Sequence, residues 1–205
     1  DKYQLASRLA DFLASFHTIG WLHENFHSNN VFYFNSSVDE GNISVAQSGI
    51  LREPHIVGLN KSRPGSNAWH TEGPLPDSDY QEYQHPQYQK TKRFRIGYDY
   101  FSLGMVLLEI GLWTPISTWT KSSKERMLLD PSKLRDLLVD RCLPRLGPRM
   151  GREYQKIVRL LLTDELDPHP EMPNPDPQSE HSAFDEFIKR VVEPLARRAS
   201  VYAEV

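Results

Sequence analysis

The chain reads Tyr98-Asp99-Tyr100-Phe101-Ser102-Leu103-Gly104-Met105-Val106-Leu107-Leu108-Glu109 near its middle, and the apolar side chains there leave no polar face. The apolar pattern continues to Leu112. A helix that is apolar nearly all round lies buried in a core. We therefore expect a central helix over residues 98–112. Asp99 would be buried in it and would need hydrogen-bond partners.

Amphipathic helices are expected on both sides of this central helix. Leu5 and Leu9 belong to a helical apolar period that predicts a helix over residues 2–18, with Gly20 as its stop. Further periods predict helices in the C-terminal part of the chain: about 131–143, 152–163 and 182–200. Ser182 is expected to begin the last of them and Pro194 to kink it.

Short apolar runs at 31–34 and 55–59 predict a small β-hairpin near the front of the chain. Residues 60–97 show no clear period and predict a long irregular segment. Within it, a cluster of aromatic and histidine side chains could form a peptide-docking surface or a remnant of a mobile segment: Tyr80, Tyr83, His85 and Tyr88. The expected fold class is mainly α (α+β), with one domain over residues 1–205.

Composition excludes several classes of protein. The 205 residues are 39% hydrophobic and 25% charged, as in ordinary globular domains. A net charge of -3 gives no electrostatic case for nucleic-acid binding, and no apolar run approaches a membrane span. The single cysteine, Cys142, excludes an internal disulfide framework and favours a reducing, cytoplasmic compartment. The chain starts at Asp1 without a methionine, which we interpret as a fragment of a longer protein.

Residues 21–34 contain a chemical motif that has two incompatible interpretations. His23-Glu24-Asn25-Phe26-His27 fits the zinc-hydrolase box H-E-x-x-H. The same residues fit a protein-kinase catalytic loop, with His23, Asn25 and Asn30 at the signature positions. The zinc box needs its two histidines one turn apart on a continuing helix, whereas Ser-Asn-Asn and a β-rich run follow His27. The sequence context therefore favours the kinase interpretation, and the zinc hydrolase stays a remote alternative.

The whole chain resembles the C-terminal lobe of a protein kinase-like domain. The segment 98–109 matches the D-x-x-S-x-G-x-x-L-x-E core helix of that family nearly completely. Other matching segments are Gly20–His23, Ser28–Phe32, Val57–Leu59, Ser62–Pro64, Tyr83–Pro86 and Arg149–Gly151. Within the family, the chain is most similar to divergent fungal kinase-like domains that accompany prion-inhibition and propagation (HeLo-type) proteins.

The resemblance implies a role for each part of the chain. The expected parts are a helix before the catalytic loop (1–20), the catalytic-loop equivalent (21–34), the activation-segment equivalent (54–87), the central helix (98–112) and C-terminal helices (130–200). In the family, the aspartate at position 99 hydrogen-bonds the catalytic-loop backbone beside the histidine at position 23. We therefore expect structural roles for Asp99 and His23.

The resemblance also implies that catalytic groups are missing. The catalytic aspartate position holds Asn25, and an amide cannot serve as a general base. The metal-binding aspartate of D-F-G is replaced by Gly58, so Asn30 is the only retained magnesium-ligand position. The loop arginine, which often pairs with a phosphorylated residue, is replaced by Glu24, which would repel it. The A-P-E triplet appears as His85-Pro86-Gln87, without its structural glutamate.

These replacements predict a catalytically impaired pseudokinase that serves as a binding or regulatory module in signalling. The alternative is a divergent active kinase that transfers phosphate from ATP to protein Ser/Thr, so enzyme activity is left open. The glycine-rich loop and ATP-binding lysine belong to an N-terminal lobe, which we expect upstream of this fragment. We expect no cofactor for the fragment itself, while Mg-ATP binding stays open for the intact domain. Protein partners are expected, but the sequence does not identify them.

Overall fold

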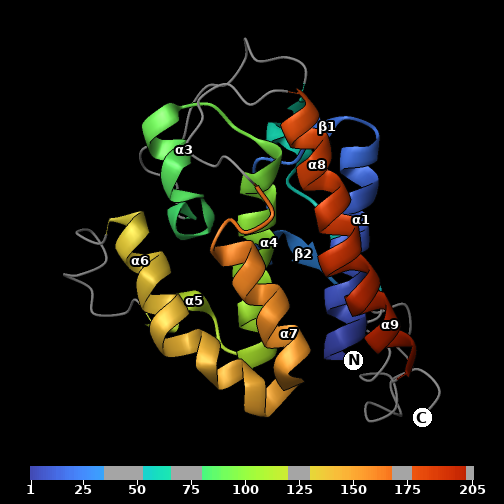
Figure 1. Cartoon of the computed structure of the whole chain (residues 1–205), viewed down its shortest axis with the longest axis vertical. Helices are drawn as coiled ribbons and strands as arrows, with labels where there is room; N and C mark the ends of the chain where they lie inside the picture. The colour runs from blue at the N-terminus through green and yellow to red at the C-terminus, as the bar shows by residue number, and fades with distance from the viewer. Residues whose placement is uncertain (35–52, 66–79, 120–129, 168–176, 202–205) are drawn as a thin grey trace.

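In the part of the chain that the structure describes, the fold is mainly helical with two small sheets (Figure 1). The computed structural model describes residues 1–34, 53–65, 80–119, 130–167 and 177–201. The α-helices are α1 (Lys2–Thr18), α3 (Pro86–Thr91), α4 (Ile96–Leu112), α5 (Ile116–Trp119), α6 (Pro131–Leu137), α7 (Leu146–Leu162), α8 (Pro177–Phe187) and α9 (Glu193–Val201). The strands are β1 (Trp21–Leu22), β2 (Val31–Phe32), β3 (His55–Ile56) and β4 (Arg63–Pro64).

Helix α4 lies at the centre of the molecule, in contact with α1, α7 and α8 (Figure 1). Every residue from Tyr98 to Leu112 is buried, so the predicted central helix is confirmed, with its start two residues earlier. Gly104 allows the close approach of α7, because a Cβ at this position would lie 2.8 Å from the Cβ of Leu161. A larger residue there would push the two core helices apart.

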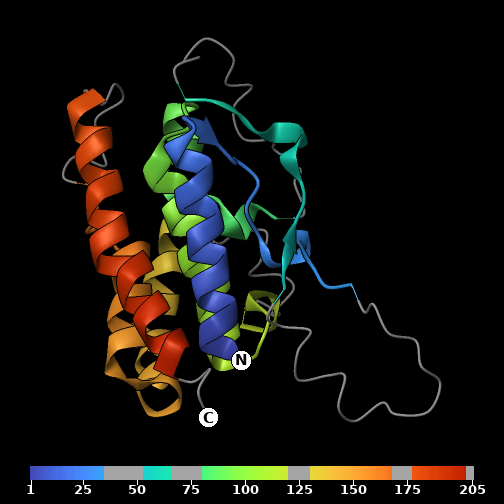
Figure 2. The same ribbon diagram turned by 90° about the vertical axis from the view of Figure 1, so that its right-hand side faces the viewer.

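Helix α1 matches its predicted range of residues 2–18 and places Leu5 and Leu9 in the core. Gly20 follows its end with φ +75°, a left-handed conformation that suits glycine. Helices α8 and α9 pack along one side of α1, and the strands lie on the opposite side (Figure 2). Among the described helices, none is long and apolar enough to cross a membrane.

The predicted β-hairpin is present, because β2 and β3 pair antiparallel with Val31 opposite Ile56. A second sheet was not predicted. It joins β1 to β4 antiparallel, with Leu22 opposite Arg63. Strands of two residues carry no alternating pattern, so the sequence holds little signal for them.

The C-terminal helices differ from their predicted boundaries. Helix α6 gives way to a π-helical stretch, Leu138–Cys142, and a 3₁₀ turn, Leu143–Arg145, that leads into α7. The α7 helix breaks at Gly151 (φ +82°), next to the predicted start at residue 152. Helix α8 begins at Pro177 rather than at Ser182, because proline suits the first helical turn.

Pro194 lies within one helical run over residues 177–201, as predicted, and the helix widens just before it. It is the second residue of α9, and the π-helical stretch Ile188–Val192 precedes it. Proline has no backbone N–H and clashes with the preceding turn. The wider turns accommodate the proline.

The segment 60–97 is more ordered than predicted wherever the structure describes it. It contains 3₁₀ turns at Leu59–Lys61 and Gln81–Tyr83, strand β4 and helix α3. His85 caps α3 by accepting a hydrogen bond from Gln87 N, and Pro86 follows at the first helical position. The His-Pro pair was therefore a helix-start signal that the pattern analysis missed.

Candidate functional site

The buried side of the 21–34 loop is organised by one carboxylate. Asp99 is fully buried in the first turns of α4, where acidic residues are favoured. Its Oδ2 accepts a hydrogen bond from His23 N at 2.8 Å, and its Oδ1 accepts one from Glu24 N at 3.0 Å. His17 Nε2, at the end of α1, lies 2.9 Å from Oδ2. Asp99 thus connects the loop to α4 through two backbone N–H groups and connects α4 to α1 through His17.

His23 is buried in an aromatic cage rather than exposed to a substrate. Its ring lies 5.9 Å from the ring of Phe12 and 5.4 Å from that of Phe26, both centroid to centroid. Its Nδ1 accepts a hydrogen bond from Asn25 N at 3.3 Å. Burial lowers the pKa of His23, which favours the neutral ring. These contacts give His23 a packing role in the loop.

Glu24 has an internal cationic partner that the sequence did not reveal. Its carboxylate pairs with the Arg63 guanidinium of β4, and both side chains are largely buried. Glu24 itself has φ 62°, a left-handed conformation that is uncommon for this residue type. Burial raises the pKa of Glu24 to about 7, although the charge of Arg63 opposes that shift. Glu24 is therefore neutralised within the fold, across the β1–β4 sheet.

The open side of the loop brings Asn25, Asn30 and Gly58 together. Asn30 Nδ2 donates to Asn25 O at 2.8 Å. Gly58 has φ +84°, and a Cβ there would lie 2.1 Å from Asn30 Nδ2. The Asn30 side chain thus occupies the space that any larger residue at position 58 would need. This part of the site offers amide groups and no carboxylate, so it lacks the ligands that magnesium prefers.

His27 completes this side of the loop. Its Nε2 lies 2.9 Å from Asn30 Nδ2, and its ring stacks on Tyr80 with centroids 3.9 Å apart. Burial lowers the pKa of His27 to about 4, so the ring is neutral near pH 7. An acceptor nitrogen in a neutral ring suits the Asn30 contact.

The zinc-hydrolase alternative does not fit this geometry. Residues 23–27 form no helix, so His23 and His27 are not held one helical turn apart on one face. One nitrogen of each histidine has another partner, since His23 Nδ1 bonds Asn25 N and His27 Nε2 contacts Asn30, and the other two nitrogens, His23 Nε2 and His27 Nδ1, are buried. In the described part of the chain, no group of three or more His, Cys, Asp or Glu side chains could hold a metal ion. The structure therefore gives no support to the zinc-hydrolase interpretation of the H-E-x-x-H string.

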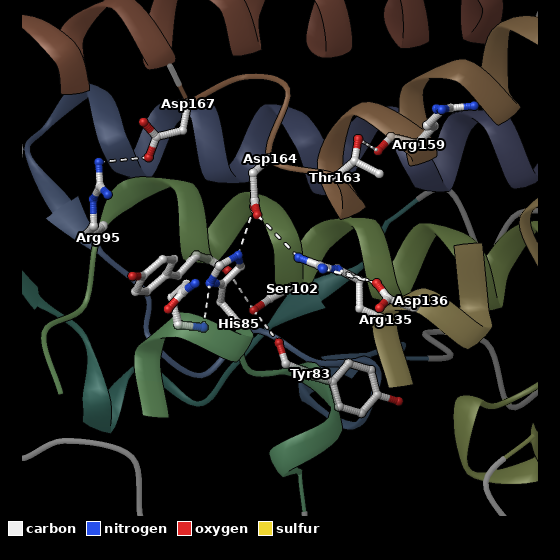
Figure 3. A network of polar contacts seen from close by, with 12 residues as sticks. Tyr83, His85, Arg95, Ser102, Arg135, Asp136, Arg159, Thr163, Asp164 and Asp167 are labelled. Atoms are coloured by element: carbon white, nitrogen blue, oxygen red, sulfur yellow. Dashed lines mark hydrogen bonds and ion pairs between the residues drawn. The ribbon is translucent and has the colours of Figure 1, made fainter. Parts of the chain in front are cut away.

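A second polar network joins the residue that caps α3 to the loop after α7 (Figure 3). His85 Nε2 lies 2.8 Å from Asp164 Oδ1, and Asp164 Oδ2 lies 3.9 Å from Arg135. His85 is fully buried and stacks on Tyr98 with centroids 4.4 Å apart. The His-Pro-Gln triplet has no glutamate, yet its first residue supplies a buried polar anchor to the loop after α7.

Of the two alternatives for the aromatic cluster, a peptide-docking surface or a remnant of a mobile segment, the docking surface is wrong for most of its members. Tyr83, His85 and Tyr88 are buried, and Ser102 Oγ donates to Tyr83 O at 2.8 Å. Tyr83 OH also donates to Glu109 Oε1 at 2.7 Å. Tyr83 and His85 face the core because the 3₁₀ turn Gln81–Tyr83 and the cap of α3 contact α4 through Ser102 and Tyr98. The sequence carried no visible signal for that packing.

Neither a protein-family model nor a curated protein matches the chain. Its function must therefore be argued from its own residues. The site combines a buried backbone anchor at Asp99 with the amides of Asn25 and Asn30, the buried imidazole of His27 and a glutamate that Arg63 neutralises. Such a set can hold a loop in one shape and can form hydrogen bonds with polar groups.

Proposed function

We propose that this chain is a kinase-like C-terminal lobe that has lost phosphotransfer and serves as a binding or regulatory module in cytoplasmic signalling. The proposal rests on one juxtaposition: Asn25, Asn30 and Gly58 converge where the resemblance expects two aspartates. Asp99, on the other side of the same loop, makes the backbone contacts that the resemblance expects. The scaffold is thus retained while the chemical groups are absent.

Phosphoryl transfer needs a residue that positions the attacking hydroxyl and metal ions that neutralise the phosphates. Asn25 can position a hydroxyl but cannot accept its proton. Asn30 retains one amide oxygen for a metal, since its nitrogen already contacts Asn25 O and His27. A single amide oxygen is a poor substitute for the carboxylates that bind Mg-ATP. The geometry therefore favours a scaffold over an enzyme.

The Glu24–Arg63 pair supports the same proposal. In the family, the loop cation often awaits a phosphorylated residue, which makes the loop switchable. Here the loop supplies the negative charge, Glu24, and strand β4 supplies the positive charge, Arg63, and both side chains are largely buried. Ser62 Oγ also donates to His23 O at 3.1 Å. The start of the activation-segment equivalent is therefore held in place without any modification, as suits a constitutive binding module.

A partner is expected on the strand side of the molecule. Trp21, Phe32, Val57 and Leu59 each expose more than a third of their surface there. Several large apolar side chains exposed on one side of a molecule indicate that another protein surface covers them. We propose that an N-terminal lobe upstream covers part of this side and that a protein partner binds near it.

The test is Mg-ATP-dependent phosphate transfer by the full-length protein, with Asn25→Ala as the control. We expect no incorporation above that control. Incorporation that Asn25→Ala abolishes would support the alternative of a divergent active kinase and would end the pseudokinase proposal. Incorporation equal in both proteins would indicate a contaminating kinase and would leave Asn25 without a catalytic role.

A further inference from the structure

A cavity of about 430 Å³ lies where the first turns of α8 approach the end of α1, strand β1 and the start of α4 (Figure 1). Its apolar walls come from four side chains: Trp21, Leu22, Ile96 and Phe184. The side chain of Glu180, in the first turns of α8, also lines the cavity, whereas no described lysine or arginine does. A mainly apolar pocket with one charged group selects its ligand through that charge.

The Glu180 carboxylate has no internal cation. Within the part of the chain that the structure describes, it takes part in no hydrogen bond or ion pair. Arg95 acts on its charge from a distance, but the guanidinium of Arg95 pairs with Asp167 at 2.8 Å. Arg63 also acts on it and pairs with Glu24 across the β1–β4 sheet. The nearby positive charges are therefore already neutralised by other carboxylates.

The position of Glu180 makes its lack of a partner unfavourable. The side chain is half-buried and lines the cavity, so a ligand in the cavity can reach it. Burial raises the pKa of Glu180, while the charge of Arg95 opposes that shift. A charge that is partly removed from water is costly unless it is paired, and a bound cation favours the ionised carboxylate. The cavity is therefore suited to a cationic group.

The chain segments next to the cavity in sequence supply no such cation. Residues 66–79 follow Gly65, which lines the cavity, and residues 168–176 precede α8. Neither segment contains a lysine or an arginine, and together they contain five acidic residues: Glu72, Asp77, Asp79, Glu171 and Asp176. An acidic environment attracts a positively charged partner. The cation that pairs with Glu180 is therefore expected from another molecule.

Two aromatic rings favour arginine over lysine as this cation. Trp21 is 38% exposed and Phe184 is half-buried, and both line the cavity. A guanidinium group stacks on aromatic faces and binds a carboxylate through two parallel N–H groups. An ammonium group is a strongly hydrated point charge that lacks the planar, two-pronged geometry.

We propose that this cavity accepts the arginine side chain of a basic peptide segment from a partner protein. The guanidinium pairs with Glu180, and the aliphatic stem packs on the apolar walls. Trp21 also belongs to the exposed apolar side on which a partner is expected. The inference rests on the binding-module part of the proposed function and gives the chemistry of the partner. It does not depend on the loss of phosphotransfer.

The test is a fluorine NMR titration of the full-length protein labelled with fluorotryptophan. The probes are capped pentapeptides, Ac-Gly-Ser-X-Ser-Gly-NH2, in which X is arginine, lysine, citrulline or glutamate. The Trp21 signal should shift saturably with the arginine peptide. We expect binding about two- to fivefold weaker with lysine and about tenfold weaker with citrulline, which has the shape of arginine without its charge. The glutamate peptide should cause no shift.

The Trp113 signal is the internal control. Trp113 follows the last residue of α4, whereas Ile96, in the cavity wall, is the first. The length of the helix separates the two positions by about 25 Å. The arginine peptide should therefore leave the Trp113 signal unchanged.

Three variants of α8 locate the site. Glu180→Gln keeps the shape of the side chain and removes its charge, so it should weaken arginine binding about tenfold and remove the advantage over citrulline. Glu186→Gln makes the same exchange on the same helix outside the cavity, where Glu186 pairs with Arg190, and should leave binding unchanged. Phe184→Leu should reduce the preference for arginine over lysine, because leucine offers no ring.

Three results would overturn the proposal. The first is the absence of a saturable Trp21 shift with the arginine peptide. The second is citrulline binding that is as tight as arginine binding. The third is a Glu180→Gln variant that loses no more affinity than Glu186→Gln, which would indicate a general effect of net charge. The phosphate-transfer assay is independent of all three, since activity there would end the pseudokinase proposal and would leave arginine binding unaffected.

Discussion

The two sides of the 23–30 loop differ in how far they depend on the identity of the loop side chains. On the buried side, Asp99 accepts hydrogen bonds from the backbone N–H groups of His23 and Glu24. Every residue except proline has such a group, so this anchor is indifferent to the loop side chains. On the open side, the chemistry depends on the side chains of Asn25 and Asn30 alone. The loop can therefore keep its shape when the side chains on its open side change.

Removal of the buried anchor should have the largest effect. Asp99→Ala leaves two buried N–H groups without an acceptor and removes the contact of His17. We expect it to lower the free energy of unfolding by about 4 kcal/mol. Urea denaturation followed by circular dichroism measures the change. Asn25→Ala is the control, and an equal loss for both variants would refute the distinction between the two sides.

The Glu24–Arg63 ion pair connects the loop to strand β4. Breaking this pair should have the second-largest effect on stability. Arg63→Gln leaves a mostly buried carboxylate without its cation and should cost about 3 kcal/mol at pH 8. The loss should shrink at pH 5, where Glu24 takes up a proton. The exchanged pair, Glu24→Arg with Arg63→Glu, should recover part of the loss. If the double variant is no better than the sum of its single changes, the pair is not coupled.

On the open side, a substitution of Gly58 should be costly, because the Asn30 side chain fills the space next to it. Gly58→Asp restores the carboxylate that the resemblance expects, but its Cβ would displace the Asn30 side chain from Asn25 O and His27. The aspartate would also have to adopt the left-handed backbone conformation of Gly58. Together, the two effects should lower the free energy of unfolding by about 2 kcal/mol. Calorimetry should still detect no magnesium binding. A variant that is as stable as the unaltered protein and binds magnesium would show that the metal site needs only this one residue.

The sequence predicted those parts of the molecule whose signal is local. Helices α1 and α4 follow from apolar spacing, and the β2–β3 hairpin from two short apolar runs. The β1–β4 sheet could not be predicted, because its strands have two residues each and β4 contains Pro64. The Glu24–Arg63 pair depends on that same register, so it was missed as well. Asp99 was predictable as a buried acid in need of partners, whereas the role of His27 required the position of Tyr80.

Glu24 and His27 should change the free energy of unfolding with pH in opposite directions. The raised pKa of Glu24 makes the folded state bind its proton more readily, so this group lowers stability as the pH rises from 4.5 to about 7. The lowered pKa of His27 does the opposite, because stability is lost as the pH falls from 6.5 to about 4. In the unaltered protein, the two trends oppose each other over most of this range.

Single variants should unmask each trend. Glu24→Gln should leave stability rising with pH between 4 and 6.5, and His27→Gln should leave it falling between 4.5 and 7. Each slope is at most about 1.4 kcal/mol per pH unit. Urea titrations at half-unit pH steps measure both. Parallel slopes in the two variants would mean that other groups control the pH response.

Asn25→Asp should have the smallest effect on stability and gives the sharpest test of the open side. The Asn25 contacts that the structure shows use its backbone, which donates to His23 Nδ1 and accepts from Asn30 Nδ2. The exchange of its amide for a carboxylate should therefore change the free energy of unfolding by less than about 0.5 kcal/mol. It should also fail to create phosphotransfer in the full-length protein, because Gly58 still supplies no metal ligand. If the aspartate alone conferred activity, the metal would be held by residues that this geometry does not bring together, and the loss of function would lie in one side chain.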